Sequence, residues 1–468
     1  MILGAATSAA AVQPPTPARP SSPAPDDAQY YYLLGRHLES LGQVDEAVVA
    51  HKRAIELDPE SPELRVELAD LYARQNNAPA AMVQAEAALA KAPANADANR
   101  ILGMAYAEFA DRNLPLRPGD DPATYLAKAI ERLEKARTDI PDIGLDVVLG
   151  QLYLQSGAFD KAVPLLRRIV DSQPASIDAV VLLSTAAESA GRPDEAVSVL
   201  ETFLRTNPGS YRAQIRIAEI REAQERWDAA ADAYGRAQSL NPRAPLTSRR
   251  AVALLSAGRP AEARDAVQAS LAAKRTEGNE SILLYLLAES QRVLKDLDAA
   301  QATAEKLLAA NPDDSRGLHV LSLIQQDKGD MKAAERTLRD IIARDPLDAN
   351  ALNSLGYMYA DRRERLDEAV SLVQRALKVE PGNPSYLDSL GWAYFQQGKL
   401  DLADAPLTEA AGKLEESSVV QDHLGDLRYK QQRFAEAVAA WKRALAGDGQ
   451  SIDRAKVEKK LREAQGRQ

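Results

Sequence analysis

An alanine recurs at intervals of about 34 residues along most of this chain, in twelve places. The alanines are Ala47, Ala81, Ala129, Ala162, Ala196, Ala230, Ala263, Ala300, Ala334, Ala369, Ala403 and Ala437. A period of this size is typical of stacked structural units, whereas an active site needs its residues only once. By length alone, 468 residues would suggest about three domains. The periodicity predicts one long array instead, because arrays grow by adding units.

The residues around each alanine predict two helices per unit. Counted from the start of a unit, positions 4, 7, 8 and 11 form one face of a first helix, A, and positions 17, 20, 24 and 27 form one face of a second helix, B. Position 8 is always Gly, Ala or Ser, and position 20 is the recurring alanine. A larger side chain at this crossing would overpack it, at a cost of about 1–3 kcal/mol. Glycine near position 15 supplies the turn, and proline at position 32 ends helix B in nine units.

Composition and charge exclude several classes of function. The net charge is −10, with acidic and basic residues interspersed, so we expect no nucleic-acid partner. No apolar run approaches the roughly 20 residues that span a bilayer, so any membrane association would be indirect. Cysteine is absent, and the four histidines are not spaced as a helical metal pair. No catalytic or phosphate-binding motif is found, so we predict neither a cofactor, nor a metal, nor a small-molecule substrate.

Both ends of the chain differ from the array. Residues 1–27 combine a small, apolar stretch with a Pro-rich segment, which indicates either the remnant of a signal peptide plus a linker or a plain disordered tail. Residues 450–468 predict a charged helix with a thin apolar stripe of Ile452, Ala455, Val457 and Leu461, suited to capping the last unit. An insertion at residues 111–124 is either tolerated drift at a turn or a loop that contacts a partner.

One eight-residue phrase returns in the last three units as NSLGYMYA (353–360), DSLGWAYF (388–395) and DHLGDLRY (422–429). This phrase, the alanine column and the proline together resemble the tetratricopeptide repeat (TPR). The resemblance implies an all-α fold, a right-handed α-solenoid or superhelix of about twelve helix-turn-helix units over residues 28–449, with helix A lining a concave groove. The units begin near residues 28, 62, 96, 143, 177, 211, 244, 281, 315, 349, 384 and 418. Trp441, at position 24, is then a core residue.

Positions 2, 5, 9, 12 and 13 of helix A are expected to point into the groove. In the last three units these positions combine hydrogen-bonding, acidic and aromatic side chains, as an extended peptide would require. The predicted partner-binding residues are Asn350, Asn353, Tyr357, Asp361, Asp388, Trp392, Gln396, Asp422 and Asp426. We expect an exposed Trp392 to be the anchor; the alternative is that it packs against neighbouring A helices. The acidic residues predict a neutral or basic ligand, and no single unit has the Lys, Arg and Asn set of a carboxylate clamp.

Residues 350–398 also resemble a narrower group, the bacterial envelope TPR proteins, which include lipoproteins and a protease adaptor. The lipobox cysteine of that group is absent. The resemblance implies a non-enzymatic scaffold or adaptor that binds a protein or peptide partner in the periplasm or cell envelope, with an assembly or protease-adaptor role. The alternatives are a cytoplasmic TPR hub of a regulatory complex and an enzyme with a cryptic site. The sequence names neither the partner nor the oligomeric state.

Overall fold

The computed structural model describes residues 26–112, 115, 121–138, 140, 142–274, 280–449 and 452–467. Within these residues the chain contains helices and no strand, which confirms the predicted all-α solenoid fold. The contacts divide the chain into two compact units, residues 1–216 (unit 1) and 217–468 (unit 2), with the boundary inside α11 (Tyr211–Ala223).

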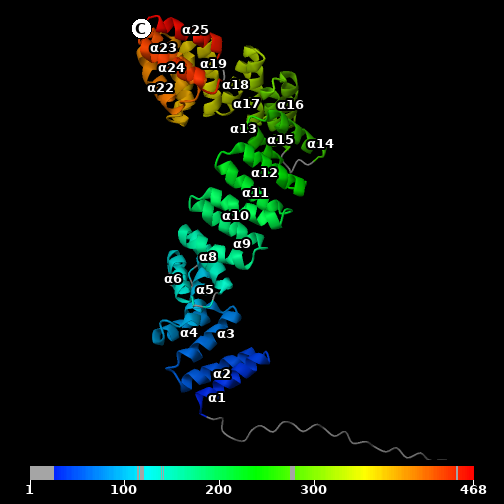
Figure 1. Cartoon of the computed structure of the whole chain (residues 1–468), viewed down its shortest axis with the longest axis vertical. Coiled ribbons are helices and arrows are strands. Elements are labelled where there is room, and N and C mark those ends of the chain that lie inside the picture. The colour runs from blue at the N-terminus through cyan, green and yellow to red at the C-terminus, as the bar shows by residue number, and fades with distance from the viewer. Residues whose placement is uncertain are drawn as a thin grey trace, which may run out of the picture. The chain divides into compact units, whose positions relative to one another are not determined.

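Unit 1 is built from helical hairpins in which an A helix is followed by a B helix. Its helices are α1 (Ala28–Ser40), α2 (Val44–Leu57), α3 (Pro62–Arg74), α4 (Ala78–Lys91), α5 (Ala96–Arg112), the short 3-10 helix η1 (Pro122–Thr124), α6 (Tyr125–Lys135), α7 (Ile143–Gln155), α8 (Phe159–Ser172), α9 (Ile177–Ser189) and α10 (Pro193–Thr206). Consecutive hairpins lie side by side within the unit (Figure 1). The 111–124 insertion lies between α5 and α6, and part of it falls outside the described residues.

Unit 2 repeats the same hairpin. Its helices are α12 (Trp227–Leu240), α13 (Thr247–Ser256), α14 (Pro260–Ala272), α15 (Glu280–Val293), α16 (Leu297–Ala310), α17 (Ser315–Asp327), α18 (Met331–Arg344), α19 (Ala349–Asp361), α20 (Leu366–Val379), α21 (Pro384–Gln396), α22 (Leu400–Lys413), α23 (Ser418–Lys430), α24 (Phe434–Ala446) and α25 (Arg454–Gln465). The A helices begin at or next to the expected unit starts, except α13, which begins a few residues later.

Short polar residues start many of the A helices. Ser61, Asp142 and Asp348 each precede an A helix, and each side chain accepts a hydrogen bond from the amide two or three residues into the helix region. An N-cap of this kind satisfies one of the amides that the first helical turn leaves without a partner. The boundary of each hairpin is therefore encoded locally, in one residue outside the apolar pattern.

The turn between helices A and B has a left-handed backbone. Gly157 and Gly191, at position 15 of their repeats, both have φ near 75°. At the same position Gln432 has φ 63° and Arg363 has φ 58°, so the turn forms even where a side chain makes this conformation costly. The predicted glycine turn is confirmed. The left-handed backbone is kept from repeat to repeat even where the residue at position 15 is not glycine.

The close approach of helices A and B is also confirmed. Every alanine of the recurring column is at most 1% exposed. At position 8, a Cβ added to Gly150 would lie 2.8 Å from a side-chain carbon of Leu166, and one added to Gly425 would lie 2.4 Å from the indole of Trp441. Positions 8 and 24 of one repeat therefore touch, and Trp441 is a core residue with 1% exposure.

The C-terminal helix α25 covers the last hairpin. Val457 and Ala464 are buried and join a core cluster with Trp441, while Leu461 packs against it partly buried. Ala455, which we expected in the apolar stripe, is exposed. Ala464 is buried instead, because it lies on the same side of the helix as Val457 and Leu461.

Candidate partner-binding surface

The predicted binding residues lie on the A-helix face of unit 2, which we define as positions 2, 5, 9, 12 and 13 of α19, α21 and α23. Helix α21 packs against both α19 and α23. Helix α25 packs against α24 and reaches α23 through an ion pair of Lys460. Four helices therefore present side chains to one surface.

Trp392 is buried, contrary to the expectation of an exposed anchor. Its side chain is only 8% exposed. The indole stacks on the ring of His423 with centroids 3.9 Å apart, and on Phe395 with centroids 5.0 Å apart. Its N–H has no hydrogen-bond partner. The alternative, packing against a neighbouring A helix, therefore describes this residue, because His423 of α23 supplies a flat ring at the contact distance.

Asp388 is buried too, because it forms an ion pair with the same histidine. Nδ1 of His423 lies 3.0 Å from both carboxylate oxygens of Asp388, and the two residues are only 5% exposed. Burial alone would lower the pKa of His423, but the charge and hydrogen bond of Asp388 outweigh it, so the pKa is raised above 6.5. Asp388 therefore holds His423 against Trp392. It is not available to bind a ligand, contrary to the expectation.

Asp422 and Asp426 are both paired with one lysine. Nζ of Lys460 lies 2.9 Å from Asp422 Oδ1 and 2.6 Å from Asp426 Oδ1. Burial would lower the pKa of Lys460, but the two carboxylates raise it overall. Burial also raises the pKa of Asp426, against the opposing effect of Lys460. Two of the three acids expected to favour a neutral or basic ligand therefore already have a cation partner from α25.

The remaining predicted residues differ in accessibility. Asn350 is exposed, and its Oδ1 accepts a hydrogen bond of 2.8 Å from the hydroxyl of Tyr386. Asn353 is half-buried, and its Oδ1 is buried without a partner. Tyr357 is half-buried with its ring 6.2 Å from that of His423, and burial raises its pKa.

A pocket of about 370 Å³ opens on this face. Four predicted residues line it: Asp361, Trp392, Gln396 and Asp426. The other lining residues are Arg363, Phe395, Tyr429, Lys430, Trp441, Lys456, Lys460 and Glu463. Asn350, Asn353, Tyr357, Asp388 and Asp422 are not among them. The pocket thus combines an aromatic lining from α21, α23 and α24 with charged residues from α19, the turn after it, α23 and α25.

Unit 1 has a larger pocket, which we did not predict, of about 770 Å³ on α3, α5 and α7. Its apolar lining includes Ile101, Met104, Val148 and Leu152. Met104 occupies position 9 of its repeat and is 44% exposed.

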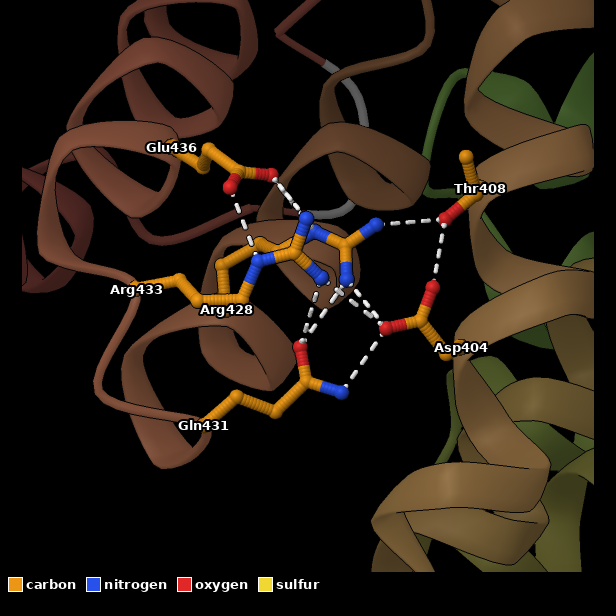
Figure 2. Close-up of polar contacts among 6 residues, drawn as sticks. All are labelled: Asp404, Thr408, Arg428, Gln431, Arg433 and Glu436. Carbon is orange, nitrogen blue, oxygen red and sulfur yellow. Dashed lines mark hydrogen bonds and ion pairs between the residues drawn. The ribbon is translucent and has the colours of Figure 1, made fainter.

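Beside the A-helix face of unit 2, a polar network joins consecutive hairpins (Figure 2). The guanidinium of Arg428, on α23, donates to Asp404 and Thr408 of α22, and Arg433 donates to the same carboxylate at 3.1 Å. Arg428 is 5% exposed. The hydrogen bond from Arg428 is the main cause that lowers the pKa of Asp404. This network fixes α23 against α22 and thereby the position of His423 on the face.

Among the described residues, no group of three or more His and acidic side chains could hold a metal ion. In the same part of the chain, no helix is long and apolar enough to cross a membrane.

A family model described as tetratricopeptide repeat matches residues 5–62, 181–245, 248–315, 320–384 and 359–415, which together make up more than half of the chain. The chain belongs to the tetratricopeptide repeat family. A second TPR model matches residues 38–105.

The chain is similar to a TPR repeat-containing protein of Pseudomonas aeruginosa, with 30% identity over 198 residues. The match covers 42% of this chain and 33% of that protein, so it spans about a third of the relative. Among solved structures, yeast Tom70 is 14% identical with a TM-score of 0.46, over 94% of this chain and 96% of that one. A TPR protein of Thermus thermophilus is 24% identical with a TM-score of 0.35, over 40% and 98% of the two chains.

The TPR register extends into the C-terminal helix, which our sequence reasoning missed. A further repeat would begin 34 residues after Ser418, and Lys456 and Lys460 then occupy its positions 5 and 9. They continue the rows of Asp422 and Asp426 on α23. Treating residues 450–468 only as a cap concealed these two lysines, although the period alone would have placed them on the A-helix face.

Proposed function

We propose that this TPR protein is a non-enzymatic scaffold or adaptor that binds a segment of a partner protein on the A-helix face of unit 2. TPR proteins generally mediate protein–protein interactions and are typically non-catalytic. The single observation that supports this location is the 370 Å³ pocket, because it is lined by residues of five helices and by four of the predicted binding residues.

The role that we propose for each predicted residue depends on how accessible its side chain is. Asp361 and Gln396 line the pocket from its accessible side, and Gln396 is half-buried. Trp392 forms part of the wall, and Asp388 supports that wall through His423. We therefore propose that the partner contacts Asp361 and Gln396 directly and reaches only the accessible edge of Trp392.

A photocrosslinking experiment tests this site. A benzoylphenylalanine crosslinker replaces Asp361 in one variant and Leu402, an exposed residue of the B helix α22, in the control. In the native host we expect the Asp361 variant to crosslink one partner protein that the Leu402 variant does not. Adding Gln396→Trp, which fills the pocket, should abolish the crosslink. Equal crosslinking at both positions, or crosslinking that survives Gln396→Trp, would contradict the proposal.

We also propose a location in the periplasm or cell envelope, with an assembly or protease-adaptor role. The support is the resemblance of residues 350–398 to envelope TPR proteins and the small, apolar composition near the N-terminus. Fractionation of the native host with an antibody against the array tests this. Recovery of the protein with cytoplasmic markers would favour the cytoplasmic hub instead.

A further inference from the structure

The pocket of unit 2 has a rim on which cations outnumber acids. Arg363, Lys430 and Lys456 line it and are exposed, and none of the three has an ion pair in the described part of the structure. Asp361 is the rim carboxylate that is likewise exposed and has no ion pair among the described residues. The other lining acids already have a lysine partner: Asp426 has Lys460 at 2.6 Å, and the exposed Glu463 has Lys459 at 4.0 Å.

The interior of the pocket is aromatic. Trp392 and Phe395 stack in parallel with centroids 5.0 Å apart. Tyr429 and Trp441 lie with ring centroids 5.7 Å apart on the side of α23 and α24. Phe395 and Tyr429 are half-buried and offer the accessible aromatic surface, whereas Trp392 and Trp441 are buried beside them. Accessible rings bind a bulky apolar side chain with large contact area and little loss of conformational entropy.

We propose that the pocket takes an acidic segment of a partner protein, in which one bulky apolar side chain enters the aromatic interior and flanking carboxylates pair with Arg363, Lys430 and Lys456. This inference rests on the proposed function and names the chemistry of its partner. It reverses the expectation drawn from the acidic sequence of the last repeats.

The reversal has a physical cause in α25. To reach Asp422 or Asp426, a basic ligand would have to displace Lys460, which is tethered to the same chain and contacts both carboxylates at once. An acidic ligand displaces nothing, because the three rim cations are solvated and have no ion-pair partner to lose. Each exposed ion pair contributes little, so the preference arises from three pairs acting together and weakens with salt.

Three fluorescein-labelled peptides test the proposal with the purified full chain. They have equal length and a central Phe, and they differ only in having Glu, Ser or Lys on both sides. By fluorescence anisotropy at low ionic strength we expect the Glu peptide to bind on the order of tenfold more tightly than the Lys peptide, with the Ser peptide between them. The difference should shrink in 0.5 M salt, where the screening length is only about 4 Å.

Two exposed cations of α25 provide a matched pair of variants, since neither has an ion pair in the described part of the structure. Lys456→Gln should weaken binding of the Glu peptide severalfold without affecting the Ser peptide. Arg454→Gln removes the same charge from the same helix, but Arg454 does not line the pocket, so it should leave both affinities unchanged. Urea unfolding of both variants, followed by tryptophan fluorescence, should show that neither loses the fold.

The outcomes separate the two proposals. Tighter binding of the Lys peptide, or equal effects of Lys456→Gln and Arg454→Gln, would overturn the acidic-partner inference while leaving the pocket as a binding site. Absence of binding by all three peptides, together with crosslinking from Asp361 that ignores Gln396→Trp, would overturn the site itself.

Discussion

The pockets of unit 1 and unit 2 occupy the same register positions and have opposite characters. In unit 1, position 9 of α5 is Met104, 44% exposed, beside Val148 at position 6 of α7. In unit 2, position 9 of α21 is Trp392, 8% exposed, stacked on His423 at position 6 of α23. The first pocket has a volume of about 770 Å³ and the second about 370 Å³.

The two pockets also differ in their charges. In unit 1 the lining arginines are paired: Arg74 with Asp70 at 2.9 Å, and Arg112 with Glu108 at 2.7 Å. In unit 2 the rim cations described above lack such partners. One TPR scaffold can therefore present a wide, electrostatically satisfied pocket in one unit and a narrow, aromatic one with available cations in the other. The size of each pocket depends on the side chains at position 9 of one A helix and position 6 of the next. Its charge in unit 2 depends also on the lysines of α25.

The largest expected effect concerns the two residues at position 9. Trp392→Ala should lower the free energy of unfolding of unit 2 by about 3–5 kcal/mol, because it removes a buried ring and leaves His423 without its stacking partner. Met104→Ala should cost less than about 1 kcal/mol, since that side chain is half in water. All three tryptophans lie in unit 2, so urea unfolding followed by their fluorescence reports on that unit; Trp227 and Trp441 remain as probes in the variant.

Circular dichroism supplies the matching measurement for Met104→Ala. A Trp392→Ala chain that unfolds at the same urea concentration as the parent would show that the ring does not support unit 2, and the contrast between the pockets would then fail.

A smaller effect is expected from the ion pair below the tryptophan. Asp388→Asn should destabilise unit 2 by about 2 kcal/mol near pH 6. This loss is smaller than for a buried charge that must stay ionised without its partner, because His423 can release its proton and become neutral. The pKa of His423 is raised in the fold, so the contribution of the pair is fully present below pH 6.5 and is lost as the pH rises through the folded-state pKa. The measurement is urea unfolding of parent and variant from pH 5 to 9.

The difference between parent and Asp388→Asn should narrow toward high pH. Asp422 and Asp426 also act on this histidine, and their charges add to the upward shift of its pKa. A constant difference across the range would mean that the pair is not charged in the fold.

The smallest effect tests the turn at position 15, where some repeats have glycine, such as Gly157, and others have a side chain, such as Gln432. Gly157→Ala should cost about 1 kcal/mol, because its φ of 75° is unfavourable for any side chain. Gly209→Ala is the control, since Gly209 does not have this backbone conformation and a Cβ there would meet no atom within 4 Å. Thermal unfolding by circular dichroism compares the two; equal losses would contradict the assignment of strain to the turn.

The hairpins, their register and their internal packing could be predicted from the sequence. The alanines of position 20 and the glycines of position 8, such as Gly425, are recognisable because the same short-range contact recurs in every unit. The turn follows for the same reason, and so does the core position of Trp441. Each of these features depends on residues of a single hairpin, whose spacing the sequence displays directly.

The candidate site was predicted only in part. The pattern placed Asp361, Trp392, Gln396 and Asp426 on one face, and the structure brings these four to one pocket. It did not predict that Trp392 is covered, nor that Asp388 is paired. Helical periodicity tells which residues share a face of the helix. Whether each of those side chains is exposed depends on the side chain that the next repeat places against it.

What the sequence by itself determined is the TPR array: where helices start, where they cross, and which surface they share. Only the tertiary structure decided the chemistry of that surface, through His423 stacking on Trp392 and Lys460 forming ion pairs with Asp422 and Asp426. The physical reason is range. Helix periodicity is set by contacts within one hairpin, whereas burial and charge on the A-helix face are set by pairs of side chains a full repeat apart, and the period specifies no particular partner for any of them.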